Sequence, residues 1–118
     1  MKMTKTFMMK LDKIQPSELY ISSEKLGNIV RSHEKLKLII IEPVPIKRLG
    51  SEIVFVEGHT RAFAALLRGL SEIPVFWEDE ELDWDLYEIC VKWRVEEGIH
   101  RIEDLESRIV SQQEYEVA

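Results

Sequence analysis

A short polar segment, Glu57-Gly-His-Thr-Arg61, stands between an apolar run and a helical pattern. The apolar run, residues 54–56, carries the β-branched and aromatic side chains of a strand buried on both faces. A helix that begins after such a strand has unpaired N–H groups and a partly positive amino end, and Gly58 lets a ligand oxygen approach the backbone there. These residue types predict an anion site, in which Arg61 supplies a fixed cation from the first helical turn.

The residues that follow predict a helix and then a returning strand. Apolar side chains recur at the spacing of one helical face, and Gly69 suits a left-handed cap at the end of the helix. Residues 73–76, Ile-Pro-Val-Phe, are then expected to be extended. The apolar face consists of Phe63, Leu66, Leu67 and Leu70.

The stretch from Glu57 to Val75 resembles the acidic-Gly-His-x-Arg box of the ParB/sulfiredoxin superfamily, including its downstream Gly and Ile-Pro-Val. Gly58, Arg61 and Ala64 also fit the Gly-x-x-Arg-x-x-Ala pattern with which ParB proteins hold nucleotide phosphates. The resemblance implies an α+β fold, with a small mixed sheet and a phosphate-binding strand-turn-helix. It implies that ATP, ADP or CTP binds through its phosphates to a loop formed by Gly58, His59, Thr60 and Arg61.

A second match lies upstream, where Leu11-Asp-Lys-Ile-Gln-Pro-Ser-Glu18 is similar to the start of the same domain. It is most similar to the archaeal free-serine kinases, in which the glutamate after the Pro-x pair is the catalytic base. Glu18 occupies that place. The resemblance covers residues 7–77 and implies a kinase that moves phosphate from ATP or ADP to a small hydroxyl acceptor with Mg²⁺.

Within that reading, Glu18, Glu57 and His59 are the candidate catalytic residues. A carboxylate at Glu57, just before a phosphate loop, would be repelled unless it met a metal, a substrate ammonium or a hydroxyl; the similar kinases have aspartate there. His59 and Thr60 would add donors to the terminal phosphate, and His59 would also serve in proton transfer.

Simpler readings of the same residues stay open. Glu18 would then be a solvated loop carboxylate, Gly58 an ordinary turn, and Arg61 a helix residue paired with Glu57. The alternative function is a ParB-like module that senses nucleotide, or a DNA-associated partition or nuclease domain, without small-molecule catalysis.

Composition limits these functions. The 118 residues suit one domain, and a net charge of −6 with a pI near 5.1 argues against affinity for a nucleic-acid duplex, so DNA binding by this chain alone is not expected. The single cysteine, Cys90, lies outside the box in which sulfiredoxins carry theirs, and it favours a reducing compartment, hence the cytoplasm. No apolar run is long enough for a secretory or membrane segment. No metal-ligating set stands out, and the acids at residues 78–81 are typical of a helix start.

The domain expectation is a ParB/sulfiredoxin-like part, residues 1–78, with a helical extension, residues 79–118, packed on it as one unit. The expected strands are residues 7–14, 38–41, 44–48 and 52–56, and the first helix runs from Ser22 or Ser23 to about Ser32. In the extension we expect helices at about 80–97 and 102–110, then a capping box over Ser111–Glu114. Apolar residues of the 80–97 helix share one face, which would pack on the sheet or on a second copy of the chain: Leu82, Leu86, Ile89, Cys90 and Trp93. His33 and His100 are expected at the surface.

Overall fold

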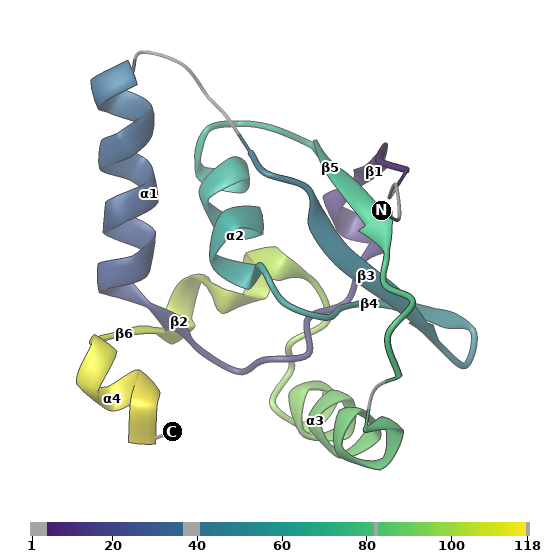
Figure 1. Ribbon diagram of the computed structural model, residues 1–118. Coiled ribbons are helices and arrows are strands. Elements are labelled where there is room, and N and C mark those ends of the chain that lie inside the picture. Colours follow the sequence, from purple (N-terminus) through teal and green to yellow (C-terminus); the bar gives the residue numbers. More distant parts are fainter. Residues whose placement is uncertain (1–4, 37–40, 82, 118) are drawn as a thin grey trace.

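The computed structural model describes residues 5–36, 41–81 and 83–117. Within these residues a mixed sheet has the strand order β1-β5-β3-β4 (Figure 1). The β1–β5 and β3–β4 pairs are antiparallel, whereas β3 and β5 are parallel. The strands are β1 (Phe7–Lys10), β3 (Val44–Leu49), β4 (Glu52–Phe55) and β5 (Glu72–Trp77). The α+β prediction with a small mixed sheet is therefore confirmed.

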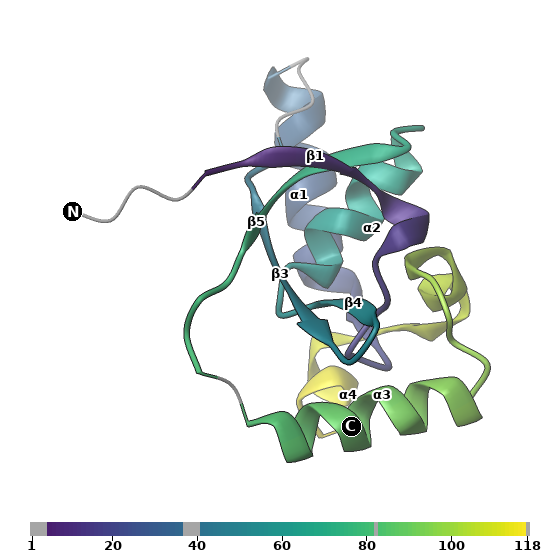
Figure 2. The ribbon, with the colours of Figure 1, turned by 90° about the vertical axis from the view of Figure 1, so that its right-hand side faces the viewer.

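Helix α2 (His59–Leu67) lies between the sheet and helix α1 (Ser23–Leu36), and the two helices pack side by side (Figures 1 and 2). Helix α2 connects β4 to β5, and Gly69, with φ of +80°, follows its end as predicted. The side chain of Ser22 accepts a hydrogen bond from the Lys25 N–H at 3.3 Å, which caps α1.

The core lies between the sheet and these helices. In β5 the buried residues alternate with more exposed ones, whereas β3 and β4 bury consecutive residues, 44–46 and 54–55. The inner face of α2 is buried as its apolar pattern predicts. Its most buried members include Ile14, Val44, Ile46, Val54, Phe55, Ala62, Phe63, Ala65, Ile73 and Val75. Among the described residues, no helix is both long and apolar enough to cross a membrane.

The chain after β5 forms helix α3 (Trp84–Glu96), a 3₁₀ helix η2 (Ile102–Arg108), strand β6 (Ile109–Val110) and helix α4 (Gln112–Val117). Strand β6 pairs in parallel with β2 (Ile21–Ser22), and this pairing brings α4 beside the start of α1 (Figure 1). One hydrogen bond of the predicted capping box is present: the Glu114 N–H donates to the Ser111 hydroxyl at 3.2 Å.

Several predicted boundaries were wrong. The first strand ends at Lys10, because Leu11–Lys13 turn into a 3₁₀ helix (η1) in which the Leu11 N–H bonds to Ser71 O at 2.9 Å. Helix α1 continues past Ser32 to Leu36, since the residues beyond Ser32 are ordinary helix formers. Of the expected 38–41 strand, residues 38–40 lie outside the described residues. The expected 102–110 helix is 3₁₀ to Arg108, and then becomes β6, which pairs with β2.

Helix α3 differs most from expectation. It begins at Trp84, capped by the Asp83 carboxylate, which accepts from the Leu86 N–H at 3.1 Å. The predicted apolar face does not pack on the sheet: Leu86, Ile89 and Trp93 are 54%, 50% and 57% exposed. The helix is held from its other side by the buried Arg94, whose guanidinium donates to Ile99 O at 2.6 Å. Leu82 lies outside the described residues, and His33 is buried whereas His100 is exposed, so the surface prediction was wrong for His33.

Candidate functional site

The loop after η1 runs along the free edge of β4. The Gln15 N–H donates to Ile53 O at 2.8 Å, and the Phe55 N–H donates to Gln15 O at 3.0 Å. This short parallel contact guides the chain past the end of β4, so that Ser17 and Glu18 meet the beginning of α2. Residues 15–18 and 56–59, far apart in sequence, thus converge on one place.

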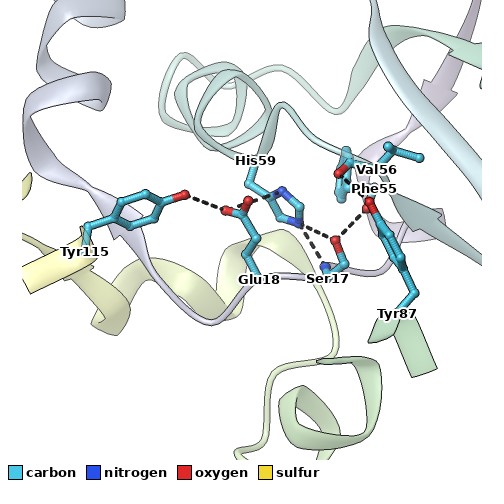
Figure 3. Close-up of polar contacts among 7 residues, drawn as sticks. All are labelled: Ser17, Glu18, Phe55, Val56, His59, Tyr87 and Tyr115. Carbon is cyan, nitrogen blue, oxygen red and sulfur yellow. Dashed lines mark hydrogen bonds and ion pairs between the residues drawn. The ribbon is translucent and has the colours of Figure 1, made fainter. Parts of the chain in front are cut away.

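Ser17 is held there by two buried hydrogen bonds (Figure 3). Its backbone N–H donates to Nε2 of His59 at 2.9 Å, and its hydroxyl donates to Phe55 O at 2.7 Å. Because Nε2 of His59 accepts a hydrogen bond, it carries no proton, and the proton of the neutral ring is on Nδ1.

His59 is therefore a neutral, buried side chain. Burial, and secondarily the positive charge of Arg94, lower the pKa of His59 to about 3. Its Nδ1 lies 3.7 Å from Oε2 of Glu18, and since the ring is neutral this contact is not an ion pair. The sequence predicts that His59 donates a hydrogen bond to the terminal phosphate and takes part in proton transfer. An imidazole that is neutral near pH 7, and whose Nε2 already accepts a hydrogen bond, suits a structural role better.

Glu18 lies between His59 and Tyr115 (Figure 3). The Tyr115 hydroxyl donates to Oε2 of Glu18 at 3.2 Å. Desolvation by burial raises the pKa of Glu18, and the nearby Glu57 raises it further, while the Tyr115 hydrogen bond and the charge of Lys25 act in the opposite direction. A carboxylate with a raised pKa is a better proton acceptor than a solvated one.

Lys25 and Tyr115 were not found from the sequence. The Lys25 ammonium lies 4.8 Å from the centre of the Tyr115 ring, which joins α1 to α4 beside Glu18. Tyr115 is 97 positions from Glu18, and no local pattern signals such a contact. The β2–β6 pairing, itself two residues long, and the packing of α4 against β2 and α1 bring the two together.

Gly58 has the backbone conformation that the strand-to-helix turn requires. Its φ is +83°, and a Cβ placed there would lie 2.9 Å from Cγ1 of Val44 and 3.1 Å from the Arg61 guanidinium. The first hydrogen bond of helix α2 runs from the Ala62 N–H to Gly58 O at 3.0 Å. By helix geometry, the preceding N–H groups, of His59, Thr60 and Arg61, point out of the helix end.

Arg61 is anchored beside that helix end. Its Nη1 donates to Pro43 O at 2.9 Å and lies 4.0 Å from a carboxylate oxygen of Glu42. The ion pair that the structure describes is thus with Glu42, not with Glu57 as the simpler reading supposed. The side chain keeps part of its surface open to solvent, and so presents a fixed positive charge.

A cleft of about 720 Å³ joins these groups. Every residue predicted for the site contributes to its wall, and α1 forms the opposite side. Its lining includes Glu18, Glu57, Gly58, His59, Thr60 and Arg61, together with Lys25, Asn28, Ile29, Ser32, Glu42 and Tyr115. The cleft thus combines a helix amino end and a guanidinium with the carboxylates of three glutamates, Glu18, Glu42 and Glu57.

The cleft has donors that suit a magnesium ion accompanied by phosphate. Glu18 and Glu57 line it together, and Mg²⁺ commonly takes one or two carboxylates plus substrate phosphates and waters. In the part of the chain that the structure describes, no group of three or more His, Cys, Asp or Glu side chains could hold a metal alone. A metal here would depend on the nucleotide for its remaining ligands.

Comparison with known proteins gives matches in structure. No family model matches the chain, and neither does any curated protein sequence. A free serine kinase in complex with AMP aligns with a TM-score of 0.59 and 23% identity, over 70% of this chain and 34% of that one. SbnI from Staphylococcus aureus, with a C-terminal truncation, aligns with a TM-score of 0.54 and 20% identity, over 64% and 31%.

A third similar structure is the C-terminally truncated chromosome-partitioning protein ParB from Caulobacter crescentus, complexed with CTP-γ-S. Its TM-score is 0.52 with 19% identity, over 78% of this chain and 53% of that one. The chain therefore spans about a third to a half of the length of these three proteins. These likenesses, with the mixed sheet and the β4–α2 turn, show that the chain has the ParB-like fold of these three structures.

Proposed function

We propose that this chain binds a nucleoside di- or triphosphate in the 720 Å³ cleft, with the phosphates at the start of α2. The N–H groups from His59 to Arg61 and the guanidinium of Arg61 would hold the phosphates, with Thr60 adding a hydroxyl. Each charge-assisted hydrogen bond contributes on the order of 1.5–3 kcal/mol, so a few of them support micromolar affinity. The nucleotides in the structures of the free serine kinase and ParB support this proposal.

We further propose that the bound nucleotide, ATP or ADP, donates its terminal phosphate to a hydroxyl acceptor. The observation that carries this is the position of Glu18: a carboxylate with a raised pKa opens on the same cleft as the phosphate-binding turn. Mg²⁺, held by Glu18 or Glu57 and by phosphate oxygens, would offset the charge on the migrating group.

Glu18 would take the proton from the acceptor hydroxyl as its oxygen attacks the terminal phosphorus. The bond from that phosphorus to the bridging oxygen breaks, and the nucleotide leaves one phosphate shorter. His59 would keep Ser17 in place through its Nε2, and so position Glu18. Glu57, on the rim of the cleft, would orient the metal or the acceptor.

The test is phosphate transfer followed by ³¹P NMR. The protein is incubated with ATP or ADP, Mg²⁺ and a pool of hydroxyl amino acids, and wild type is compared with Glu18→Gln. We expect Glu18→Gln to lose transfer while it still binds nucleotide. Glu24→Gln, an exposed acid of α1 that does not line the cleft, is the matched control and is expected to keep full activity.

Calorimetry with adenosine and cytidine nucleotides separates this proposal from the alternative. Nucleotide binding with no transfer to any acceptor would favour a ParB-like sensing module. Absence of binding by any di- or triphosphate would overturn both.

A further inference from the structure

A second cavity, which we call the groove, reaches Glu18 from the side of α3. It has a volume of about 340 Å³, and it is lined by Ser17, Glu18, Leu19, Tyr20, Cys90, Trp93 and Tyr115. Glu18 and Tyr115 line this groove and the 720 Å³ cleft as well. The candidate base therefore stands in a partition between two cavities of different character.

The two cavities differ in their chemistry. The 720 Å³ cleft collects the helix amino end, Arg61, Lys25 and polar side chains of α1, which suits phosphate and ribose. In the groove the side chains beyond the partition are chiefly apolar or aromatic: Leu19, Tyr20, Cys90 and Trp93. Glu18 is the one carboxylate among the groove's lining residues.

Trp93 makes the groove more apolar than a solvent-facing helix surface requires. It is 57% exposed, and Leu86 and Ile89 extend the same exposed face along α3. Helix α3 is fixed in this orientation from its other side, where buried Arg94 donates to Ile99 O at 2.6 Å and also bonds Oε1 of Gln15. A contiguous apolar patch that borders a cavity with a polar group is a feature of ligand-binding grooves.

We propose that this groove is the acceptor site, and that the acceptor is a small alcohol whose hydroxyl is attached to an aromatic or comparably large apolar body. The inference rests on the proposed phosphotransferase function. The apolar body lies against Trp93 and Leu19, and the hydroxyl reaches Glu18 at the partition. A volume of about 340 Å³ lies at the lower end of the range for small-molecule sites, and so suits one ring and a short side chain.

Because Glu18 lines both cavities, the acceptor in the groove and the nucleotide in the cleft can react while each stays in its own site. The alcohol oxygen forms a bond to the terminal phosphorus of the nucleotide in the cleft, and its proton passes to the Glu18 carboxylate. The bond between that phosphorus and the bridging oxygen breaks, and the shortened nucleotide keeps the electron pair. Acceptor and nucleotide enter from opposite sides of Glu18.

The experiment compares two alcohols with the same hydroxyl group, ethanol and 2-phenylethanol, in the ³¹P transfer assay. We expect the wild-type kcat/KM to be higher for 2-phenylethanol. Trp93→Ala is expected to lower that value by about tenfold, and to leave transfer to ethanol and nucleotide affinity unchanged. Leu86→Ala is the control on the same helix, because Leu86 is 54% exposed but does not line the groove.

Equal use of both alcohols by the wild type, or an equal loss for both in Trp93→Ala, would overturn the inference. A dimer in sedimentation that dissociates in Trp93→Ala would also overturn it, since a second copy would then cover Trp93.

Saturation-transfer NMR of 2-phenylethanol, without nucleotide, separates failure of the groove from failure of the chemistry. Binding that Trp93→Ala weakens and Glu18→Gln keeps confirms the groove as a site for aromatic alcohols, even if no phosphate is ever transferred. Binding in the groove without any phosphate transfer would overturn the proposed phosphotransfer and leave the groove proposal standing. Absence of binding to the wild type would overturn the groove.

Discussion

The backbone N–H of Ser17 donates a buried hydrogen bond of 2.9 Å to Nε2 of His59. This bond joins the loop that carries Glu18 to the first residue of α2, at whose start we propose that the phosphates bind. It requires an unprotonated Nε2, which is why the electrostatics of His59 matter for the whole site. The imidazole is 2% exposed and its pKa is lowered to about 3.

The first prediction concerns stability against acid. In the unfolded chain the pKa of histidine is about 6.5, so the unfolded state binds a proton that folded His59 refuses. The stabilisation is therefore fully present above pH 6.5 and is lost as the pH falls toward 3. By pH 5 the loss is on the order of 2 kcal/mol. Urea unfolding at pH 5 and pH 7 measures it.

The matched variants are His59→Gln and His100→Gln. Glutamine cannot take up a proton in the unfolded state, so His59→Gln is expected to be flatter between pH 7 and pH 5, whatever its stability at pH 7. His100 is exposed, and its variant should follow the wild type. If the free energy of unfolding of His59→Gln falls between pH 7 and pH 5 as steeply as that of the wild type, the assignment of the acid sensitivity to His59 is wrong.

The second prediction concerns Gly58. Alanine at φ of +83° carries the left-handed strain of about 1–2 kcal/mol, and its Cβ would also press on Val44 and Arg61. Crowding of this kind adds about 1–3 kcal/mol and would displace the turn at which we propose that the phosphates bind. We expect Gly58→Ala to lower thermal stability and to weaken ADP binding together.

Gly50→Ala provides the control for backbone strain. Gly50 has φ of +62° in the β3–β4 turn, and nothing lies within 4 Å of an added Cβ. It should show the strain without the crowding, and should keep its ADP affinity. If both variants lose equal stability, the contact with Val44 has no energetic weight.

The strand-turn-helix was predictable because its determinants are local. The apolar run before Glu57, the glycine with positive φ and the helical stripe after it each follow from neighbouring residues, and the structure has all three. Glu18 was predicted from the resemblance alone, yet the contact that brings it to His59 depends on Gln15 running along β4. No sequence pattern specifies that pairing.

The orientation of α3 could not be predicted for a related reason. Its apolar residues predicted a buried face, but Arg94 is fully buried on the other side of the helix and bonds Ile99 O. An arginine is rarely a core residue, and its burial is tolerated here because its guanidinium donates to Ile99 O and to Gln15, the second of which lies 79 positions away. Tyr115 likewise reaches Glu18 through a pairing that joins opposite ends of the chain.

The third prediction tests Arg61 as a phosphate ligand. Arg61→Ala removes one charge-assisted contact, worth on the order of 1.5–3 kcal/mol, so ADP affinity should fall about tenfold or more. Arg48→Ala is the control, because Arg48 is exposed and lies 5.2 Å from the Trp77 ring, away from the cleft. Calorimetry measures both. An ADP affinity of Arg61→Ala equal to that of Arg48→Ala would remove Arg61 from the site.

The last prediction concerns Tyr115 as a positioning residue for Glu18. Its hydroxyl donates to the carboxylate and lowers the pKa of Glu18 against the effect of burial, so Tyr115→Phe should raise that pKa. A base is active when deprotonated, and the acidic limb of the kcat profile should therefore move to higher pH while the plateau above it is kept. Tyr87→Phe is the control, since the Tyr87 hydroxyl donates to the backbone carbonyl of Val56 at 3.3 Å and Tyr87 lines neither cavity. A Tyr115→Phe profile lowered equally at every pH would indicate that the tyrosine only supports the fold.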